Sequence, residues 1–130
     1  MKIILTVIAL TVAAFVFFYV TSGNENKATR IDAETFKQKH KENPGLVIDV
    51  RTKEEFNNGH LELADHNYDF RNGEFKAQID NLTKDETYYL YCRSGNRSGQ
   101  AAKLMKEKGF EKVYNIGGFQ QLVQAGLKAE

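Results

Sequence analysis

The chain of 130 residues contains one cysteine, one proline and no tryptophan. The single cysteine, Cys92, excludes an intramolecular disulfide, a Cys-x-x-Cys redox pair and a zinc site built from several cysteines. Its thiol is therefore either a reactive group that acts alone or half of an intermolecular bridge. The sequence also lacks an excess of charge, since 18 Lys and Arg residues oppose 17 Asp and Glu residues. A chain this close to neutral has no long-range field for polyanions, so we expect no nucleic-acid partner and only local anion sites.

A long hydrophobic run occupies the N-terminal part of the chain. All 18 residues from Ile3 to Val20 are uncharged, and most are apolar. As a helix this run would measure about 27 Å, close to the thickness of the hydrocarbon core of a bilayer. We therefore expect residues 1–23 to form one hydrophobic helix, a signal peptide or a membrane anchor, and residues 24–29 to form a polar linker.

The two ends of this run bear on its fate. Lys2 favours a cytoplasmic N-terminus, which places the folded domain outside the cytoplasm. The bulky residues 17–19 favour an uncleaved anchor, although the small residues 21–23 offer a cleavage site. We expect an exported protein, in the periplasm or on the extracytoplasmic face of the membrane, that is anchored there or released after cleavage.

Residues 30–128 alternate short apolar runs with helical patterns, as one α/β domain does. Strands are predicted at residues 29–31, 46–50, 66–70, 87–91 and 112–116, and helices at residues 32–43, 73–82, 98–110 and 117–127 with a short one beginning near 52. Asp32 is placed to cap the first helix, and Thr52 with Glu55 has the pattern of a capping box. This order implies a four- to five-stranded parallel sheet with helices on both faces.

Cys92 directly follows the most strand-like segment of the chain. In open parallel sheets, ligands bind at the carboxyl ends of the strands, beside helix N-termini. Gly95 and Asn96 accept left-handed backbone conformations, which let successive N–H groups point inward around an anion. Arg93, Arg97 and the following helix N-terminus favour the thiolate, so we expect a lowered pKa for Cys92. The pattern indicates a reactive thiol beside an anion site.

Several stretches, in order along residues 30–128, resemble the single-domain rhodaneses. CRSGNRS resembles the active-site loop of that family, and GFEKVYNIGGFQQL resembles its closing strand and Gly-Gly turn, at Gly117 and Gly118. VIDVRTKEEFNNGHL resembles its Asp-x-Arg and Gly-His region, carried here by Asp49, Arg51, Glu55, Gly59 and His60.

This resemblance implies a thiosulfate sulfurtransferase that needs no metal or organic cofactor. Cys92 would take the outer sulfur of thiosulfate or a similar anionic donor as a persulfide, and pass it to a thiophilic acceptor such as cyanide or a thiol. Arg93 and Arg97 would orient the donor while backbone N–H groups cradle the persulfide. The substrate-binding set expected from the resemblance is Arg93, Ser94, Gly95, Asn96, Arg97 and Ser98.

Three further residues are expected to support this site. Asp49 and Arg51 follow another strand, so they should lie near the site, and we favour a structural ion pair over a direct catalytic role. His60 is expected to order the loop after the second helix. A metal site at His60 and His66 lacks a third ligand at a useful spacing.

Other functions stay open at this point. Cysteine-dependent phosphatases and arsenate reductases share the loop, but their motif needs Arg six positions after the cysteine, where this chain has Ser98. A non-catalytic rhodanese-like module, or a sulfur carrier served by a protein partner at the membrane, could keep the same fold. The chain departs from the family pattern at Leu63, where glycine is common, and at Leu122, where many members carry Trp.

Overall fold

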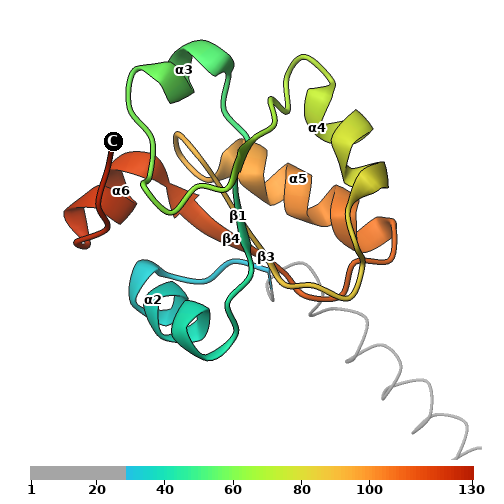
Figure 1. Cartoon of the computed structure of the whole chain (residues 1–130), viewed down its shortest axis with the longest axis horizontal. Coiled ribbons are helices and arrows are strands. Elements are labelled where there is room, and N and C mark those ends of the chain that lie inside the picture. Colours follow the sequence, from blue (N-terminus) through green and yellow to red (C-terminus); the bar gives the residue numbers. More distant parts are fainter. Residues whose placement is uncertain (1–28) are drawn as a thin grey trace, which may run out of the picture.

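The structure, a computed structural model, describes residues 29–130 (Figure 1). The predictions of an N-terminal hydrophobic helix over residues 1–23, and of a linker that continues to residue 29, fall outside this part except for Thr29 itself. Within residues 29–130, no helix combines the length and the hydropathy that are needed to cross a bilayer.

Four parallel strands form one sheet with the strand order β2-β1-β3-β4. The strands are β1 (Leu46–Asp49), β2 (His66–Asn67), β3 (Tyr88–Cys92) and β4 (Val113–Gly118). The helices are α2 (Ala33–Glu42), α3 (Lys53–Asn57), α4 (Glu74–Gln78) with a 3-10 turn η1 (Ile79–Asn81), α5 (Asn96–Glu107) and α6 (Phe119–Gln124). The predicted α/β fold is confirmed, with four strands.

Both predicted helix caps are confirmed. The side chain of Asp32 accepts a hydrogen bond from the backbone N–H of Thr35 at 2.7 Å. Thr52 and Glu55 form a full capping box at the start of α3. These side chains satisfy backbone N–H groups that have no partner inside the helix, so they fix where each helix begins.

Some predicted elements differ from those observed. The strand predicted at residues 29–31 is a single bridge, in which Ile31 N–H donates to the Asn115 carbonyl at 3.0 Å. The strand predicted at residues 66–70 is confirmed for His66 and Asn67 only, although the N–H groups of Tyr68 and Phe70 still donate to the carbonyls of Asp49 and Val50. The helix predicted at residues 73–82 ends as the 3-10 turn η1, a tighter form that is frequent at helix ends.

Helices cover both faces of the sheet, α4 and α5 on one and α2 and α6 on the other (Figure 1). Side chains that alternate along a strand enter opposite cores. The core under α4 and α5 includes Ile48, Val50, Phe75, Leu90, Ala102, Met105 and Phe110. The core under α2 and α6 includes Phe36, Val47, Leu61, Tyr89, Tyr91 and Leu122. Because β1 and β3 are buried on both sides, β3 and the first three residues of β1 are continuously hydrophobic rather than alternating.

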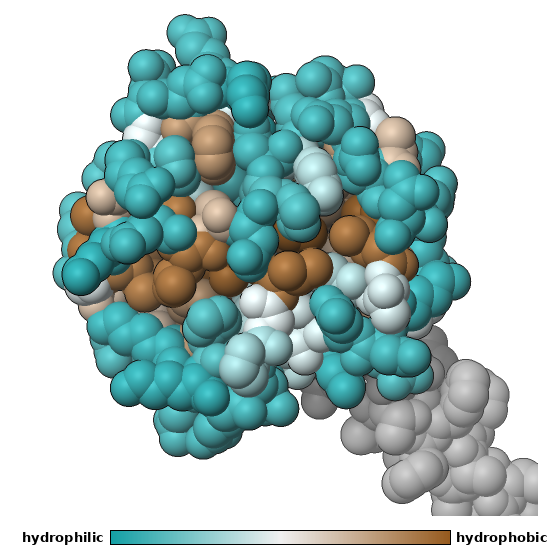
Figure 2. All heavy atoms as spheres, viewed as in Figure 1, coloured by the Kyte–Doolittle hydropathy of each residue, from teal (hydrophilic) through white to brown (hydrophobic). Residues whose placement is uncertain are grey.

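The outer surface is mostly hydrophilic. In Figure 2, hydrophobic side chains form a band across the middle of one face, between hydrophilic surroundings. Within residues 29–130, Leu63 is the large hydrophobic side chain that is clearly exposed, at 40%. Leu63 is also the position where the family pattern commonly has glycine, so this departure lies at the surface, away from both cores.

Candidate functional site

The thiol of Cys92 lies at the carboxyl edge of the sheet, where all four strands end. Cys92 is the last residue of β3, is fully buried, and pairs with Gly118 of β4. Gly95 adopts a positive φ of 96° and its N–H donates to Sγ at 3.0 Å. A left-handed backbone at this position favours glycine. The turn therefore returns the chain to the sulfur before α5 begins, at Asn96 rather than at the predicted residue 98.

The pKa of the Cys92 thiol lies below its ordinary value. Burial raises this pKa, but hydrogen bonds from the side chain and backbone of Ser98 and from the backbone of Ser94 and Gly95 outweigh the effect of burial. The predicted direction is confirmed. The expected cause is corrected. The sequence pointed first to the arginines, but the N–H and O–H donors of the loop stabilise the thiolate most strongly.

Asn115 of β4 ties this loop to the sheet. It is 4% exposed. Its Oδ1 accepts hydrogen bonds from Ser98 Oγ at 2.7 Å and from the Gly117 N–H at 3.0 Å, and its Nδ2 donates to the Gly95 carbonyl at 2.9 Å. One side chain thus holds two of the residues that hydrogen-bond to Sγ, Gly95 and Ser98. Sequence reasoning missed Asn115, although a lone Asn inside a buried strand is a signal that its amide has partners there.

Arg97 is engaged by a carboxylate. Its guanidinium donates to both oxygens of Glu55, at 2.8 and 3.0 Å. The hydrogen bond from Arg97 lowers the pKa of Glu55 to about 2. The pair joins α5 to α3 across the mouth of the loop. Arg93, by contrast, is exposed and forms no ion pair within residues 29–130.

The loop borders an open pocket of about 640 Å³. Its lining residues are Phe70, Arg71, Arg93, Ser94, Asn96, Arg97 and Gln100. Four of the six predicted binding residues therefore face one space. The other two, Gly95 and Ser98, are buried and hydrogen-bond to Sγ.

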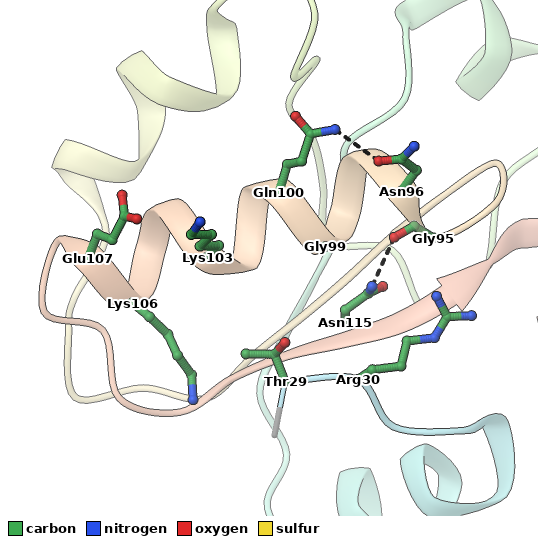
Figure 3. A pocket seen from close by; sticks show the side chains of 10 residues that line it. All are labelled: Thr29, Arg30, Gly95, Asn96, Gly99, Gln100, Lys103, Lys106, Glu107 and Asn115. Atoms are coloured by element: carbon green, nitrogen blue, oxygen red, sulfur yellow. Dashed lines mark hydrogen bonds between the residues drawn. The ribbon is translucent and has the colours of Figure 1, made fainter. Parts of the chain in front are cut away.

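A second pocket, of about 710 Å³, lies along α5 beside the edge of β4 (Figure 3). Arg30, Lys103 and Lys106 line it together with Asn115. The guanidinium of Arg30 fills the space next to Gly95, so no Cβ could be added to that glycine without displacing it. The first described residues of the chain thereby cover the back of the Cys92 loop, a contact that the sequence did not predict.

Asp49 and Arg51 form the expected ion pair. Arg51 donates to the Asp49 carboxylate at 2.7 to 3.1 Å, and both side chains are buried. Arg51 also donates to the Gly59 carbonyl at 2.6 Å and lies over the Phe119 ring, 4.4 Å from its centroid. The pair therefore joins the end of β1 to the loop after α3 and to α6.

His60 lies in the loop after α3, as expected. Its Nδ1 is 3.0 Å from the Phe56 carbonyl and its ring stacks on that of Phe56. Its backbone exchanges two hydrogen bonds with Glu130. Among residues 29–130, no three His, Cys, Asp or Glu side chains converge as a metal site would need. The absence of a metal cofactor stays a prediction.

Known proteins are similar to this chain in fold and in sequence. A model of the rhodanese-like domain matches residues 32–125. The chain is 35% identical over 97 residues to "Putative sulfur carrier protein YrkF" of Bacillus subtilis, covering 74% of this chain and 51% of that relative, so it spans about half the relative's length. It is 31% identical over 83 residues to the thiosulfate sulfurtransferase PspE of Escherichia coli, covering 62% of this chain and 77% of PspE.

A solved structure agrees with these matches. The crystal structure of a rhodanese-related protein from Thermoplasma volcanium aligns with a TM-score of 0.66 and 26% identity, covering 78% of this chain and 96% of that one. The family match includes the whole sheet, both helical layers and the loop that surrounds Cys92. The chain belongs to the rhodanese-like domain family.

Proposed function

We propose that this protein is a sulfurtransferase that moves sulfane sulfur from thiosulfate, or a similar anionic donor, to a thiophilic acceptor. The observation that carries this proposal is the buried Cys92 thiol, whose pKa is lowered by hydrogen-bond donors of its own loop. A thiolate at neutral pH is the nucleophile that the reaction needs. The similarity to a relative named as a thiosulfate sulfurtransferase supports the choice of donor.

In the first half-reaction, the Cys92 thiolate attacks the outer sulfur of thiosulfate. A new S–S bond forms, the donor's own S–S bond breaks, and sulfite leaves with its electron pair. Cys92 is left as a persulfide that carries one negative charge. The loop donors that stabilise the thiolate, Gly95 N–H and Ser98 Oγ, lie close enough to stabilise this charge as well.

In the second half-reaction, cyanide or a thiolate attacks the outer sulfur of the persulfide. Thiocyanate or a new persulfide leaves, and the Cys92 thiolate is restored. The cycle is a double displacement, so one activated cysteine is sufficient. Asn115 should keep the loop in one geometry through both half-reactions, because it holds Gly95 and Ser98, two of the residues that donate to the sulfur.

The experiment is a thiosulfate–cyanide assay of the purified full chain that follows sulfite and thiocyanate together. We expect both products in equal amounts, double-displacement kinetics, and no turnover by Cys92→Ser. Turnover that survives in Cys92→Ser would contradict the proposal.

A sulfur carrier with protein partners is the second candidate, and the relative named as a sulfur carrier favours it. It would use the same persulfide but take or deliver sulfur through a protein. Loading of Cys92 by thiosulfate without release to cyanide or small thiols would support this carrier. A chain that no sulfur donor loads would instead be a binding module.

We also propose that the protein is exported and anchored in the membrane by residues 1–23. The support is the uncharged run from Ile3 to Val20. Membranes from cells that express the full chain should retain it after alkaline extraction, and its mass should include Met1. A soluble protein that begins near residue 24 would show cleavage instead.

A further inference from the structure

The pocket above the Cys92 loop contains a cation that the predicted binding set omits. Arg71 lies between β2 and α4, far from the loop in sequence, yet it lines the same pocket as Arg93 and Arg97. Arg97 is already paired with Glu55. Within residues 29–130, neither Arg71 nor Arg93 forms an ion pair. Two arginines without a carboxylate partner in the described residues therefore line this pocket from different segments of the chain.

The backbone at Arg71 is held in place. Its N–H donates to Oδ1 of the buried Asp69 at 2.7 Å. The preceding residue, Phe70, donates its N–H to the Val50 carbonyl at 3.1 Å, and its ring lies 6.0 Å from that of Phe75 in the core. These contacts use the backbone of Arg71, and its exposed side chain is left available to a ligand in the pocket that this residue lines. A substitution of that side chain therefore keeps the fold of the segment.

The charge at the pocket suits a small dianion. Three arginines line it, and no acidic residue does. Glu55 compensates one of them, so a net charge of about two positive units remains for a ligand. We propose that the sulfonate end of the sulfur donor binds in this pocket between Arg71 and Arg93. This inference rests on the proposed function and deepens it, because it assigns the donor site to a residue outside the loop.

The arrangement fits the proposed chemistry. Guanidinium groups hold oxyanions through paired N–H donors. The oxygen atoms of thiosulfate gain charge as sulfite leaves, so cations at this end stabilise the leaving group while Sγ attacks the other end. Arg97 then has a different role, which is to fix α5 against α3 through Glu55.

Binding can be measured apart from sulfur transfer. The full chain with Cys92→Ser cannot be loaded, so calorimetric titration of this variant with thiosulfate reports the anion site alone. We expect Arg71→Ala to raise the Kd about five- to tenfold, a modest effect because the site is open to solvent. Arg71→Lys should keep most of the affinity. Lys84→Ala, which removes an exposed cation from the segment before β3, at the opposite edge of the sheet, is the matched control and should leave the Kd unchanged.

The outcomes separate this inference from the proposed function. If thiosulfate binding depends on Arg71 but the native protein never acquires sulfur, the inference of an anion site stands and the proposed sulfurtransferase function is rejected. Equal affinity with and without the Arg71 guanidinium, or no binding at all, would overturn the inference even if the native protein is active.

Discussion

At the scale of single residues, the proton of the Ser98 hydroxyl decides part of the thiol's reactivity. One hydroxyl hydrogen serves two acceptors, Asn115 Oδ1 at 2.7 Å and Cys92 Sγ at 3.4 Å. Asn115 Oδ1 also accepts from the Gly117 N–H at 3.0 Å, so it keeps a partner when the hydroxyl turns away. We infer that the hydroxyl bonds to Asn115 beside a neutral thiol and turns to Sγ when the thiolate or persulfide forms.

Replacement of Ser98 by Ala should raise the pKa of Cys92, because the thiolate loses a donor and the thiol loses little. Ultraviolet absorbance against pH measures the thiolate of the single cysteine, when Cys92→Ser is titrated in parallel to subtract the ionisation of the six tyrosines. Gln100→Ala, which removes an exposed side chain that bonds to Asn96, is the control. An unchanged or lower pKa in Ser98→Ala would show that the hydroxyl remains on Asn115.

Asn115 should be more important to stability than its size suggests. Asn115→Ala leaves Ser98 Oγ, the Gly117 N–H and the Gly95 carbonyl without their partner in a buried place. We expect a loss of about 3 kcal/mol in the free energy of unfolding by urea. Asn72→Ala, at an exposed site where the Asn72 Oδ1 accepts from the Glu74 N–H, should cost at most about 1 kcal/mol. Equal losses for the two variants would contradict this account of the loop.

At the scale of elements, Glu55 joins two helices that both border the site. Its Oε1 accepts hydrogen bonds from the N–H and hydroxyl of Thr52 in the capping box of α3. Its two carboxylate oxygens also accept hydrogen bonds from Nη1 and Nη2 of Arg97 in α5. The capping half of this role was predictable from the spacing of Thr52 and Glu55. The partner in α5 was not, because 42 residues separate the two and only the parallel topology brings the helices together.

The ion pair between Glu55 and Arg97 should weaken in acid. The pKa of Glu55 is about 2 in the folded protein, against an ordinary value of 4.5. A depressed pKa stabilises the fold fully above pH 4.5, and this contribution is lost as the pH falls from 4.5 towards 2. At neutral pH, Glu55→Gln should cost roughly 2 kcal/mol in urea unfolding, and the difference from the native chain should shrink over that pH range.

The control for this prediction is Glu34→Gln. Glu34 pairs with Lys37 on the exposed face of α2, where an ion pair is worth at most about 1 kcal/mol. If the difference in unfolding free energy between the native chain and Glu55→Gln stays constant from neutral pH to pH 2, the stabilising ion pair between Glu55 and Arg97 is ruled out.

At the scale of the whole molecule, much of the fold follows from local sequence. Some features depend on a few neighbouring residues only, and these could be predicted. They are the buried run at β1, the run that ends at Cys92 and the two helix caps, and the structure confirms each of them. Elements that depend on distant partners were predicted less well. The segment before α2 is a bridge rather than a strand, because among the described residues its backbone pairs with β4 at one position, Arg30 with Asn115.

The same division applies to the site. Cys92 and its loop form one continuous stretch, which local chemistry and family resemblance both identify. Asn115 and Arg30 contact that loop from other segments, and Arg71 lines the same pocket. A lone Asn in a buried strand signals that its amide has partners, but nothing in the neighbouring residues shows that the partners lie in the Cys92 loop. Asp49 and Arg51 were predictable as a pair because they are two residues apart at a strand end.

One sheet carries both cores, so the described domain should unfold as a unit. Phe36 of α2 and Phe75 of α4 each pack into the core on one face of the sheet, and each is fully buried. Replacement of either by Ala should cost about 3 to 5 kcal/mol. Tyrosine fluorescence and circular dichroism should report the same urea midpoint in each variant. Separate midpoints for the two probes would indicate that the two helical layers unfold independently.

The central claim is that Cys92 carries sulfur as a persulfide, and the intact mass of the full chain tests it most directly. The mass should rise by one sulfur atom after thiosulfate and return to its first value after cyanide, while Cys92→Ser stays unchanged in both steps. A native chain whose mass does not change with thiosulfate, or an equal gain in Cys92→Ser, would contradict it.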